Sequence, residues 1–391
     1  MPSVPDDICP RHTEVPVQPT SPFSPPIYLA SVWSAESTDE ADSILAGRVS
    51  GYMYQRDGHP NADLFAAKCC ELHRAQRAAV TSSGMAALVT AVLSQIESGD
   101  HVVVSKMLFG RSLMLLGQEL TRLGISSTLV DTGDLAATAA AFEPRTKLLA
   151  VETISNPLLR VANIPRLAEL AHSRGAKLLV DNTFATPVLC QPLTLGADLV
   201  FESVSKMMNG HSDVMLGLLC GGESVWERVP LVVSCWGLAS SPFDCWLSLR
   251  GLSTLHLRVE RACVNAMRAA EFLATQAAVE HVDYPGLANH CDHELATKLL
   301  GSRYGSMVTI RLPGGRKAAD AFMHAAKRIA FCPSFGEVAT TLSHPETTSH
   351  RSLTPQERAA LGIHGGTIRL SVGVESAEYV IDALAEGLAS V

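Results

Sequence analysis

The chain has 391 residues, of which 47% are hydrophobic and 18% are charged, and its net charge is -8 at pH 7. This length suits one large domain and a smaller one, and the composition is that of a folded α/β protein and not of a disordered chain. The acidic balance and the lack of a Lys/Arg cluster argue against nucleic acid and anionic membranes as partners, because phosphate-rich surfaces attract basic patches.

Neither a secretory signal nor a membrane-spanning run is expected. The first residues contain acids and prolines without a continuous apolar segment, and no run of about 18 apolar residues follows. We therefore expect a cytoplasmic protein. The ten cysteines stand singly, apart from Cys69 and Cys70, and lack the spacing of metal ligands. Reduced thiols are the favoured interpretation, no metal is expected, and structural zinc is the weaker alternative.

Residues 1–53 are expected to form an N-terminal arm. The segment is rich in proline, serine and threonine, and Pro25 followed by Pro26 excludes regular helix at that point. We expect an extended arm that packs against another part of the assembly, such as a second subunit.

Residues 54–250 are expected to form a large domain in which helices and strands alternate. Such alternation predicts crossover connections and a mainly parallel sheet that is covered on both faces. In sheets of this kind ligands bind at the carboxyl ends of the strands. The expected helices cover residues 82–99, 110–124 and 164–175, and the expected strands cover residues 101–105, 127–131, 148–155, 176–184 and 197–203.

Residues 251–391 are expected to form a smaller α+β domain. A long helical pattern follows residue 250, then short strand patterns at 304–312 and 367–373, and then a closing helix. The fold class is therefore α/β, with a mainly parallel central sheet, a smaller C-terminal domain and an N-terminal arm.

Polar residues follow several of the predicted strands of the large domain. Asn156, Asp181, Ser203 and Lys206 all lie at or just beyond the carboxyl end of a strand, so they should converge at one edge of the sheet. The helix predicted next to Gly84 begins with unpaired N–H groups and a positive partial charge, and glycine lets a phosphate approach the backbone. The four polar groups and this helix start outline a site.

A phosphate cradle, a carboxylate and a lysine together indicate pyridoxal phosphate (PLP). Lys206 would bind the cofactor as an aldimine, and Asp181 would pair with the pyridinium nitrogen so that the ring can accept electrons. Singly, Lys206 is read as a surface lysine and Asp181 as a turn residue or helix cap. Their joint placement at strand ends of one sheet favours the cofactor site.

The chain also resembles a known family over almost its whole length. The segments YMYQRDGHPNAD, SSGMAA, ETISNPLLRVANI, VDNTFATP, SVSKMMNGHSDVMLG, HPETTSH and GTIRLSVGVE are similar to those of PLP-dependent enzymes of cysteine and methionine metabolism. This family includes cystathionine γ-synthase, the cystathionine lyases, methionine γ-lyase and the homoserine sulfhydrylases. The resemblance implies fold type I, the fold of aspartate aminotransferase.

The resemblance implies how the cofactor is held. The hydroxyl groups of Ser203 and Ser205 and the N–H groups of Gly84 and Met85 would bind its phosphate. Asn156 would lie near the ring oxygen. None of these roles follows from spacing alone; each is transferred from the matching motif.

The resemblance further implies a substrate grip and a shared site. Arg369, helped by Ser334, would bind the α-carboxylate of an amino-acid substrate, and Lys206 would move protons between substrate carbons. Tyr54 and Arg56 would reach the cofactor phosphate of the neighbouring subunit. Shared sites imply an obligate homodimer, usually paired into a homotetramer.

Four positions depart from the family pattern. Phe109 stands where a tyrosine is usual, so the stacking surface is kept and the hydroxyl is lost. Arg111 is either a surface arginine or a cation near the distal end of the substrate, where it would suit an acidic group. Pro333 replaces a glutamate of enzymes that handle cystathionine, and His59 replaces an asparagine.

Three functions are consistent with these residues. The first is γ-replacement on an activated homoserine, in the manner of cystathionine γ-synthase or a sulfhydrylase. The second is a C–S lyase that releases a thiol, ammonia and a 2-oxo acid from methionine or cystathionine. The third is a weakly catalytic PLP-binding regulator, which the complete set of cofactor residues disfavours.

Overall fold

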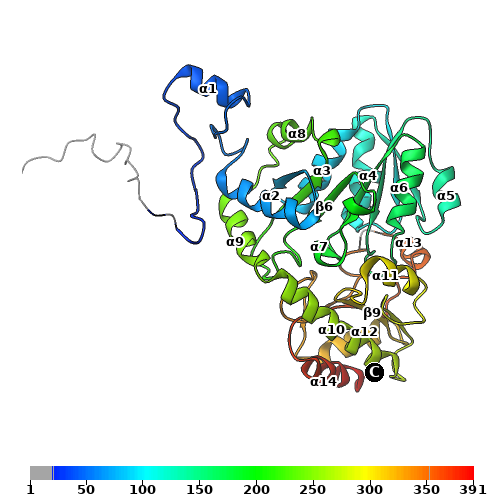
Figure 1. The fold of residues 1–391 in the computed structure, drawn as a ribbon. Coiled ribbons are helices and arrows are strands. Elements are labelled where there is room, and N and C mark those ends of the chain that lie inside the picture. The colour runs from blue at the N-terminus through cyan, green and yellow to red at the C-terminus, as the bar shows by residue number, and fades with distance from the viewer. Residues whose placement is uncertain (1–19, 21, 352) are drawn as a thin grey trace, which may run out of the picture.

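The computed structural model describes residue 20 and residues 22–351 and 353–391, so the first 19 residues of the predicted arm lie outside it. Figure 1 shows a larger body that contains α2 to α9, a smaller body built around α10, α12 and α14, and an N-terminal segment that stands to one side. Within the described residues, no helix is both long and apolar enough to cross a membrane.

The larger body is built on a seven-stranded sheet in the order β1-β7-β6-β5-β4-β2-β3. Neighbours from β6 to β3 are parallel, whereas β7 runs antiparallel to both β6 and β1. The predicted mainly parallel α/β sheet is thus confirmed. The strands are β1 (Arg77–Thr81), β2 (His101–Ser105), β3 (Ser126–Val130), β4 (Thr146–Glu152), β5 (Lys177–Asp181), β6 (Leu199–Ser203) and β7 (Gly217–Gly221).

Strand β2 shows why these strands have continuous apolar sequences. Val103 belongs to the core cluster on the side of α6 (Ile164–Ser173), whereas Val102 and Val104 belong to the cluster on the side of α3 (Gly84–Gln95). Both faces of the sheet are therefore buried. The other helices of this body are α2 (Pro60–His73), α4 (Gly110–Gly117), α5 (Leu135–Ala140), α7 (Thr186–Leu189), α8 (Val229–Cys235) and α9 (Pro242–Leu252).

Helix α10 (Leu255–Ala274) leads from the large sheet to a second, five-stranded sheet in the order β10-β11-β12-β9-β8. Its core joins Val308 and Ile368 of the sheet to α10, α12 and α14. The predicted division at residue 250 falls in the last turn of α9. The remaining elements are β8 (His281–Asp283), β9 (Met307–Arg311), β10 (Ala330–Phe331), β11 (Thr341–Ser343), β12 (Thr367–Ser371), α11 (His293–Leu300), α12 (Arg316–Ala325), α13 (Pro355–Ala360) and α14 (Ala377–Leu388).

The helix predicted for residues 110–124 is broken in two. Helix α4 ends at Gly117, and a 3-10 turn, η1 (Glu119–Leu123), follows it. Glycine is a poor helix former, which explains the end of α4. Gly124 then takes a left-handed conformation with φ of 76°, and this reverses the chain toward β3.

The arm is not extended throughout, which corrects the sequence prediction. Helix α1 (Thr38–Leu45) lies within it, because the Ser37 hydroxyl accepts the N–H bond of Glu40 and acidic residues occupy its first turn. Before α1, the arm packs on the large domain, where the carbonyl of Pro25 accepts the indole N–H of Trp246 at 2.8 Å.

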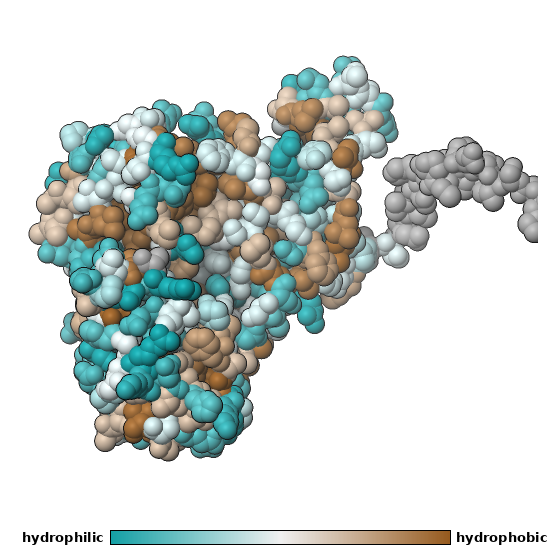
Figure 2. Space-filling model, turned by 180° about the vertical axis from the view of Figure 1, so that it is seen from behind, coloured by the Kyte–Doolittle hydropathy of each residue, from teal (hydrophilic) through white to brown (hydrophobic). Residues whose placement is uncertain are grey.

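Apolar side chains are exposed on the arm and on the adjoining side of the large domain. Figure 2 shows brown residues on the projecting segment and along the edge of the body beneath it. The exposed groups include Leu29 and Val32 on the arm and Trp236 after α8, each more than half accessible. Apolar groups gathered on one side of a protein indicate an interaction surface.

Candidate active site

One cavity of about 290 Å³ lies where the large sheet meets the small domain. It is at the carboxyl ends of β4, β5 and β6, the position at which parallel sheets bind ligands. The four residues predicted to converge, Asn156, Asp181, Ser203 and Lys206, all line it, and Arg369 reaches it from β12. The structure therefore brings the four residues together at one cavity, as the strand ends predict.

The N-terminus of α3 forms one wall of the cavity. Ser83 caps the helix through the N–H of Ala86, and the N–H groups of Gly84 and Met85 have no acceptor among the described residues. A Cβ atom on Gly84 would lie 2.7 Å from the Cβ of Ser203, so only glycine lets the helix approach the end of β6 this closely. Two free N–H groups and the helix dipole thus lie beside the Ser203 hydroxyl, an arrangement that binds anions.

Asp181 ends β5 and uses one of its carboxylate oxygens for local bonds. Both the N–H and the hydroxyl of Thr183 donate to Oδ1, at 2.9 and 2.5 Å, whereas Oδ2 has no donor among the described residues. Burial raises the pKa of Asp181 to about 6, although the bonds from Thr183 lower it. A cationic partner at Oδ2 would favour the ionised form.

The amine of Lys206 lies in the cavity in a partly buried position. Its Nζ donates a 2.7 Å hydrogen bond to the hydroxyl of Ser334. Burial lowers the pKa of Lys206, and the positive charge of Arg369 lowers it further. The site therefore makes the neutral amine, the form that can act as a nucleophile or accept a proton, easier to reach than in water.

Arg258 on α10 holds the turn that carries this lysine. Its guanidinium donates to the carbonyl groups of Met207 and Met208, at 2.7 and 3.0 Å. Gly210 lies against the same guanidinium with φ of 81°, and a Cβ there would be 2.0 Å from Nη1. Helix α10, which leads into the small domain, thus fixes the backbone next to Lys206 through Arg258.

Arg369 is a buried cation without a carboxylate partner within ion-pair distance among the described residues. Nη1 donates to Oδ1 of Asn156 at 2.7 Å, and Nη2 donates to the carbonyl of Ser334 at 3.0 Å. Its Nε is buried without a partner in the described part of the chain. Burial lowers the pKa of Arg369 to about 10. An anionic ligand would relieve this unbalanced charge.

The opposite wall begins at Phe109, the residue before α4. Phe109 and Arg111 both line the cavity. Arg111 contacts the Sδ of Met114 at 3.5 Å and, in the part of the chain described, has no carboxylate within 4.0 Å. Arg111 is exposed to solvent at the cavity wall, so both interpretations of it, a surface arginine and a cation near a ligand, stay open.

Three predicted cofactor residues lie away from this cavity. The hydroxyl of Ser205 donates to the carbonyl of Leu216 at 3.3 Å and accepts its N–H at 3.0 Å. Arg56 lies 4.8 Å above the ring of Tyr54, and neither side chain lines the cavity. Their suggested role in the site of a neighbouring subunit stays a prediction, whereas Ser205 braces the lysine segment against the start of β7.

His59, noted as a departure, has a structural explanation. Its Nδ1 accepts the N–H of Ala62 at 3.1 Å and caps α2, and its Nε2 contacts the hydroxyl of Ser240 at 3.2 Å. The imidazole nitrogen takes the place of an amide oxygen as a helix cap.

Sequence reasoning missed Glu152, Thr183 and Phe335 among the residues of the site. Glu152 is the last residue of β4 and pairs in register with Asp181 on β5. The rule that selected Asp181, a polar residue at a strand end, applies equally to Glu152.

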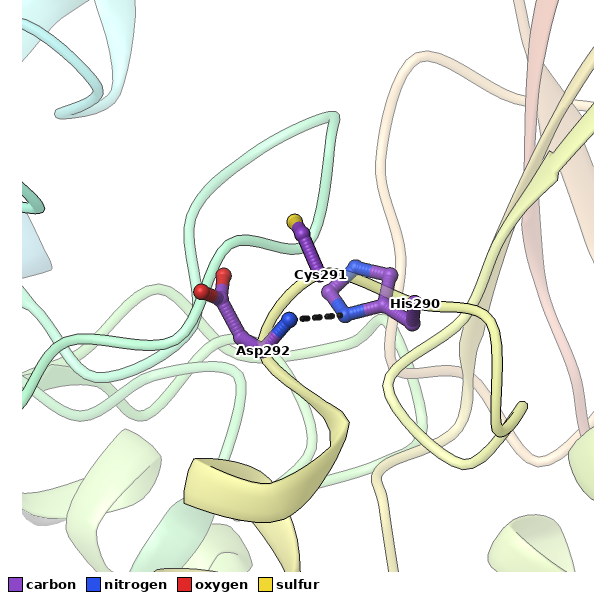
Figure 3. Close-up of side chains that lie close together, drawn as sticks. All are labelled: His290, Cys291 and Asp292. Atoms are coloured by element: carbon purple, nitrogen blue, oxygen red, sulfur yellow. Dashed lines mark hydrogen bonds between the residues drawn. The ribbon is translucent and has the colours of Figure 1, made fainter.

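A group of His290, Cys291 and Asp292 lies outside the cavity (Figure 3). The carboxylate of Asp292 accepts bonds from Arg160 at 2.6 and 3.3 Å, and its N–H donates to Nδ1 of His290. An adjacent guanidinium opposes a metal cation, so these contacts are those of an ion pair and a turn. The nine cysteines of the described residues are free thiols.

The residues of the cavity fit PLP. The free N–H groups of Gly84 and Met85 beside Ser203 suit a phosphate, the unbonded oxygen of Asp181 suits a pyridinium nitrogen, and Lys206 has a lowered pKa. These groups supply the anion site, the counter-charge and the amine that this cofactor requires.

Comparison with known proteins gives the same result. Residues 12–389 match the family described as Cys/Met metabolism PLP-dependent enzyme. O-succinylhomoserine sulfhydrylase from Pseudomonas aeruginosa is 40% identical over 365 residues, which cover 93% of this chain and 90% of the relative. L-methionine gamma-lyase from Porphyromonas gingivalis is 38% identical over 368 residues, which cover 93% of this chain and 92% of the relative.

A solved structure is similar over both domains. The crystal structure of cystathionine gamma synthase from Xanthomonas oryzae pv. oryzae in complex with cystathionine has a TM-score of 0.89 and 35% identity, and the match covers 94% of this chain and 93% of that one. The predicted fold type I and the PLP cofactor are confirmed, and the protein is an enzyme of γ-elimination or γ-replacement. The chain belongs to the family of PLP-dependent enzymes of cysteine and methionine metabolism.

Proposed function

We propose that this enzyme catalyses γ-replacement on an activated homoserine whose ester carries an acidic group. The observation that carries the proposal is Arg111, a cavity-lining cation that has no carboxylate partner among the described residues. Arg369 supplies a first cation for the α-carboxylate, so Arg111 supplies a second one for a substrate with an acid at its distal end.

Residues of the cavity would hold the cofactor at three points. The N–H groups of Gly84 and Met85 and the hydroxyl of Ser203 would bind its phosphate, and Asp181 would pair with its ring nitrogen. When bound, PLP supplies an electron sink for negative charge that forms on the substrate carbon beside the amino group. Asn156 keeps its Nδ2 available for the ring oxygen, because its Oδ1 is taken by Arg369.

Arg369 and Lys206 act on the substrate itself. Arg369 binds the α-carboxylate as a fork and so places the substrate Cα near the amine of Lys206. This amine removes the proton from Cα and returns protons to the carbon chain, for which its lowered pKa suits it. The hydroxyl of Ser334 accepts a hydrogen bond from the amine of Lys206 and so fixes the position of this amine in the cavity.

The missing hydroxyl at Phe109 supports an ester substrate. A carboxylate such as succinate leaves as a stable anion and needs no proton from the enzyme, whereas a thiolate leaves much better when it is protonated. Phe109 offers a stacking surface and no acid, and Arg111 offers a positive charge to the departing anion. Both departures from the family pattern are thereby explained by one substrate class.

The name of one relative agrees with this choice. O-succinylhomoserine, after which the Pseudomonas aeruginosa relative is named, is a homoserine ester with a distal carboxylate. In the replacement, the bond between Cγ and the ester oxygen breaks, and a nucleophile such as a thiol forms a new bond to Cγ.

A C–S lyase is the second candidate. Pro333 and Phe335 make part of the cavity wall apolar, which suits the side chain of methionine, and one relative is named L-methionine gamma-lyase. A lyase would need a source of protons for the thiolate other than Phe109.

We further propose a homodimer with shared sites, paired into a homotetramer. Arg56 and Tyr54 lie on the surface beside the arm and not at the cavity of their own subunit. The apolar groups exposed on the arm and the adjoining body offer a surface for the partner (Figure 2). Light scattering of the purified protein measures the assembly.

Replacing Arg111 by alanine tests the proposed substrate class. We expect the apparent KM for O-succinylhomoserine to rise about tenfold, because one charge-assisted contact contributes roughly 1.5 kcal/mol. The apparent KM for O-acetylhomoserine, which has no distal charge, should change less than twofold. Arg122→Ala removes a surface arginine paired with Glu119 and serves as the matched control. Equal effects on the two esters would remove Arg111 from the substrate site.

A further inference from the structure

Glu152 is a buried carboxylate at the edge of the cavity with no assigned role. Its two oxygens accept bonds from two backbone segments: Oε1 from the N–H of Phe109 at 2.7 Å and Oε2 from the N–H of Asn156 at 3.2 Å. Phe109 stands at the N-cap position of α4, and its side chain cannot accept a hydrogen bond there. Glu152 supplies an acceptor at this helix start. One carboxylate thus links the two walls of the site.

Asn156 connects this carboxylate to the small domain. Its Oδ1 accepts the bond from Nη1 of Arg369, and the carbonyl of the next residue, Pro157, accepts the hydroxyl of Thr309 at 2.6 Å. Thr309 and Arg369 are direct partners in the β9–β12 pair. Arg369 and Thr309, neighbours in the small sheet, therefore bond to the consecutive residues Asn156 and Pro157. On the other side, Glu152 accepts the backbone N–H of Asn156.

We propose that Glu152 is a positioning residue that, through the backbone of Asn156, sets the orientation in which Arg369 receives the substrate α-carboxylate. The inference rests on the proposed role of Arg369. Glu152 does not touch the α-carboxylate; it acts through the chain Glu152, Asn156, Arg369.

Only a carboxylate of this length suits both donors. An amide of the same shape has one oxygen and one NH₂ group, so it can accept only one of the two N–H bonds and turns a donor toward the other. Burial and the nearby Asp181 raise the pKa of Glu152, and the N–H bonds from Phe109 and Asn156 lower it. Two N–H donors, one to each oxygen, would stabilise the ionised carboxylate at this buried position.

The test compares two ligands that differ only in the carboxylate. L-Norleucine and n-pentylamine have the same alkyl chain and amine, and neither carries a leaving group. Their dissociation constants are measured on the PLP-loaded protein by the change in absorbance of the bound cofactor. In Glu152→Gln we expect norleucine to bind about tenfold more weakly, equivalent to ~1.4 kcal/mol, and pentylamine to bind within twofold of the unchanged protein.

Pentylamine binding is the internal control for folding and for cofactor loading. Glu202→Gln is the matched control, because Glu202 on β6 is also a buried carboxylate but bonds to Asn182 and not to the backbone of the site. In Glu202→Gln, the ratio of the dissociation constants for norleucine and pentylamine should equal that of the unchanged protein. If Glu152→Gln fails to load PLP, Glu152→Asp keeps the charge but is too short for both N–H groups, and it should show the same selective loss.

Equal weakening of both ligands in the Glu152 variant, or no change in either, would overturn the proposal, as would the same selective loss in Glu202→Gln. Arg369→Ala, measured in parallel, separates this inference from the proposed function. If that variant loses the preference for norleucine over pentylamine, the carboxylate role of Arg369 stands whatever Glu152 does. If it keeps the preference, the role of Arg369 itself is wrong, and the inference on Glu152 is overturned with it.

Discussion

Replacing Lys206 by alanine is expected to abolish the absorbance near ~420 nm that a lysine-bound PLP gives, together with nearly all turnover. The amine of Lys206 is in the cavity, its pKa is lowered by burial, and it has a 2.7 Å bond to Ser334. No other lysine lines this cavity in the described part of the chain. The measurement is the absorbance spectrum and the steady-state rate of the purified, PLP-loaded variant.

Two further variants make this result specific. Lys206→Arg places a long basic side chain in the same position, but a guanidinium cannot form the bond to the cofactor, so this variant should fail as completely as alanine. Lys106→Ala removes a half-exposed lysine paired with Asp131 at 3.1 Å and should keep the spectrum and the rate. Turnover that survives in either Lys206 variant would contradict the assignment.

Replacing Arg369 by alanine is expected to raise the apparent KM for amino-acid substrates about 100-fold, because a bidentate contact to a carboxylate contributes roughly 3 kcal/mol. Arg369 is 3% exposed and has a buried Nε with no partner among the described residues, so an unused donor of its guanidinium is available to a ligand. kcat should fall less than KM rises, because Lys206 and Asp181 stay in place.

A control arginine is available in the same domain. Arg316 on α12 is exposed and pairs with Asp320, so Arg316→Ala should leave both constants unchanged. If the KM of Arg369→Ala equals that of the unchanged protein, the α-carboxylate is bound elsewhere and the orientation of the substrate in this site must be revised.

The strands buried on both faces were predictable because their sequences carry a strong pattern. The residues of β2, HVVVS, form one apolar run, and the predicted range of 101–105 is that of the strand. β7, with the sequence GLLCG, escaped prediction because glycine stands at both of its ends. β7 runs antiparallel to β6, so the connection between them needs no crossover helix whose sequence pattern would indicate a following strand. Helix α1 was not predicted, because its capping serine lies in a segment rich in proline, serine and threonine that was expected to be extended.

Site residues at strand ends were predictable, and those that depend on tertiary contacts were not. Asp181 is the last residue of a recognisable strand and Lys206 follows another, and parallel strands end at one edge. The bond from Arg369 to Oδ1 of Asn156 joins residues 213 positions apart, and no local pattern encodes it. Ser205 was placed at the phosphate by its motif, whereas its hydroxyl bonds to Leu216 on the neighbouring segment.

Product analysis of the PLP-loaded protein tests the proposed γ-replacement most directly. The enzyme is offered O-succinyl-, O-acetyl- and O-phosphohomoserine with and without cysteine, and methionine and cystathionine alone. We expect a new thioether amino acid only when cysteine is present, with O-succinyl- or O-phosphohomoserine preferred over the uncharged ester. If 2-oxobutanoate and ammonia form from methionine or cystathionine alone, and no replacement product appears, the enzyme is a lyase and the proposed reaction is wrong.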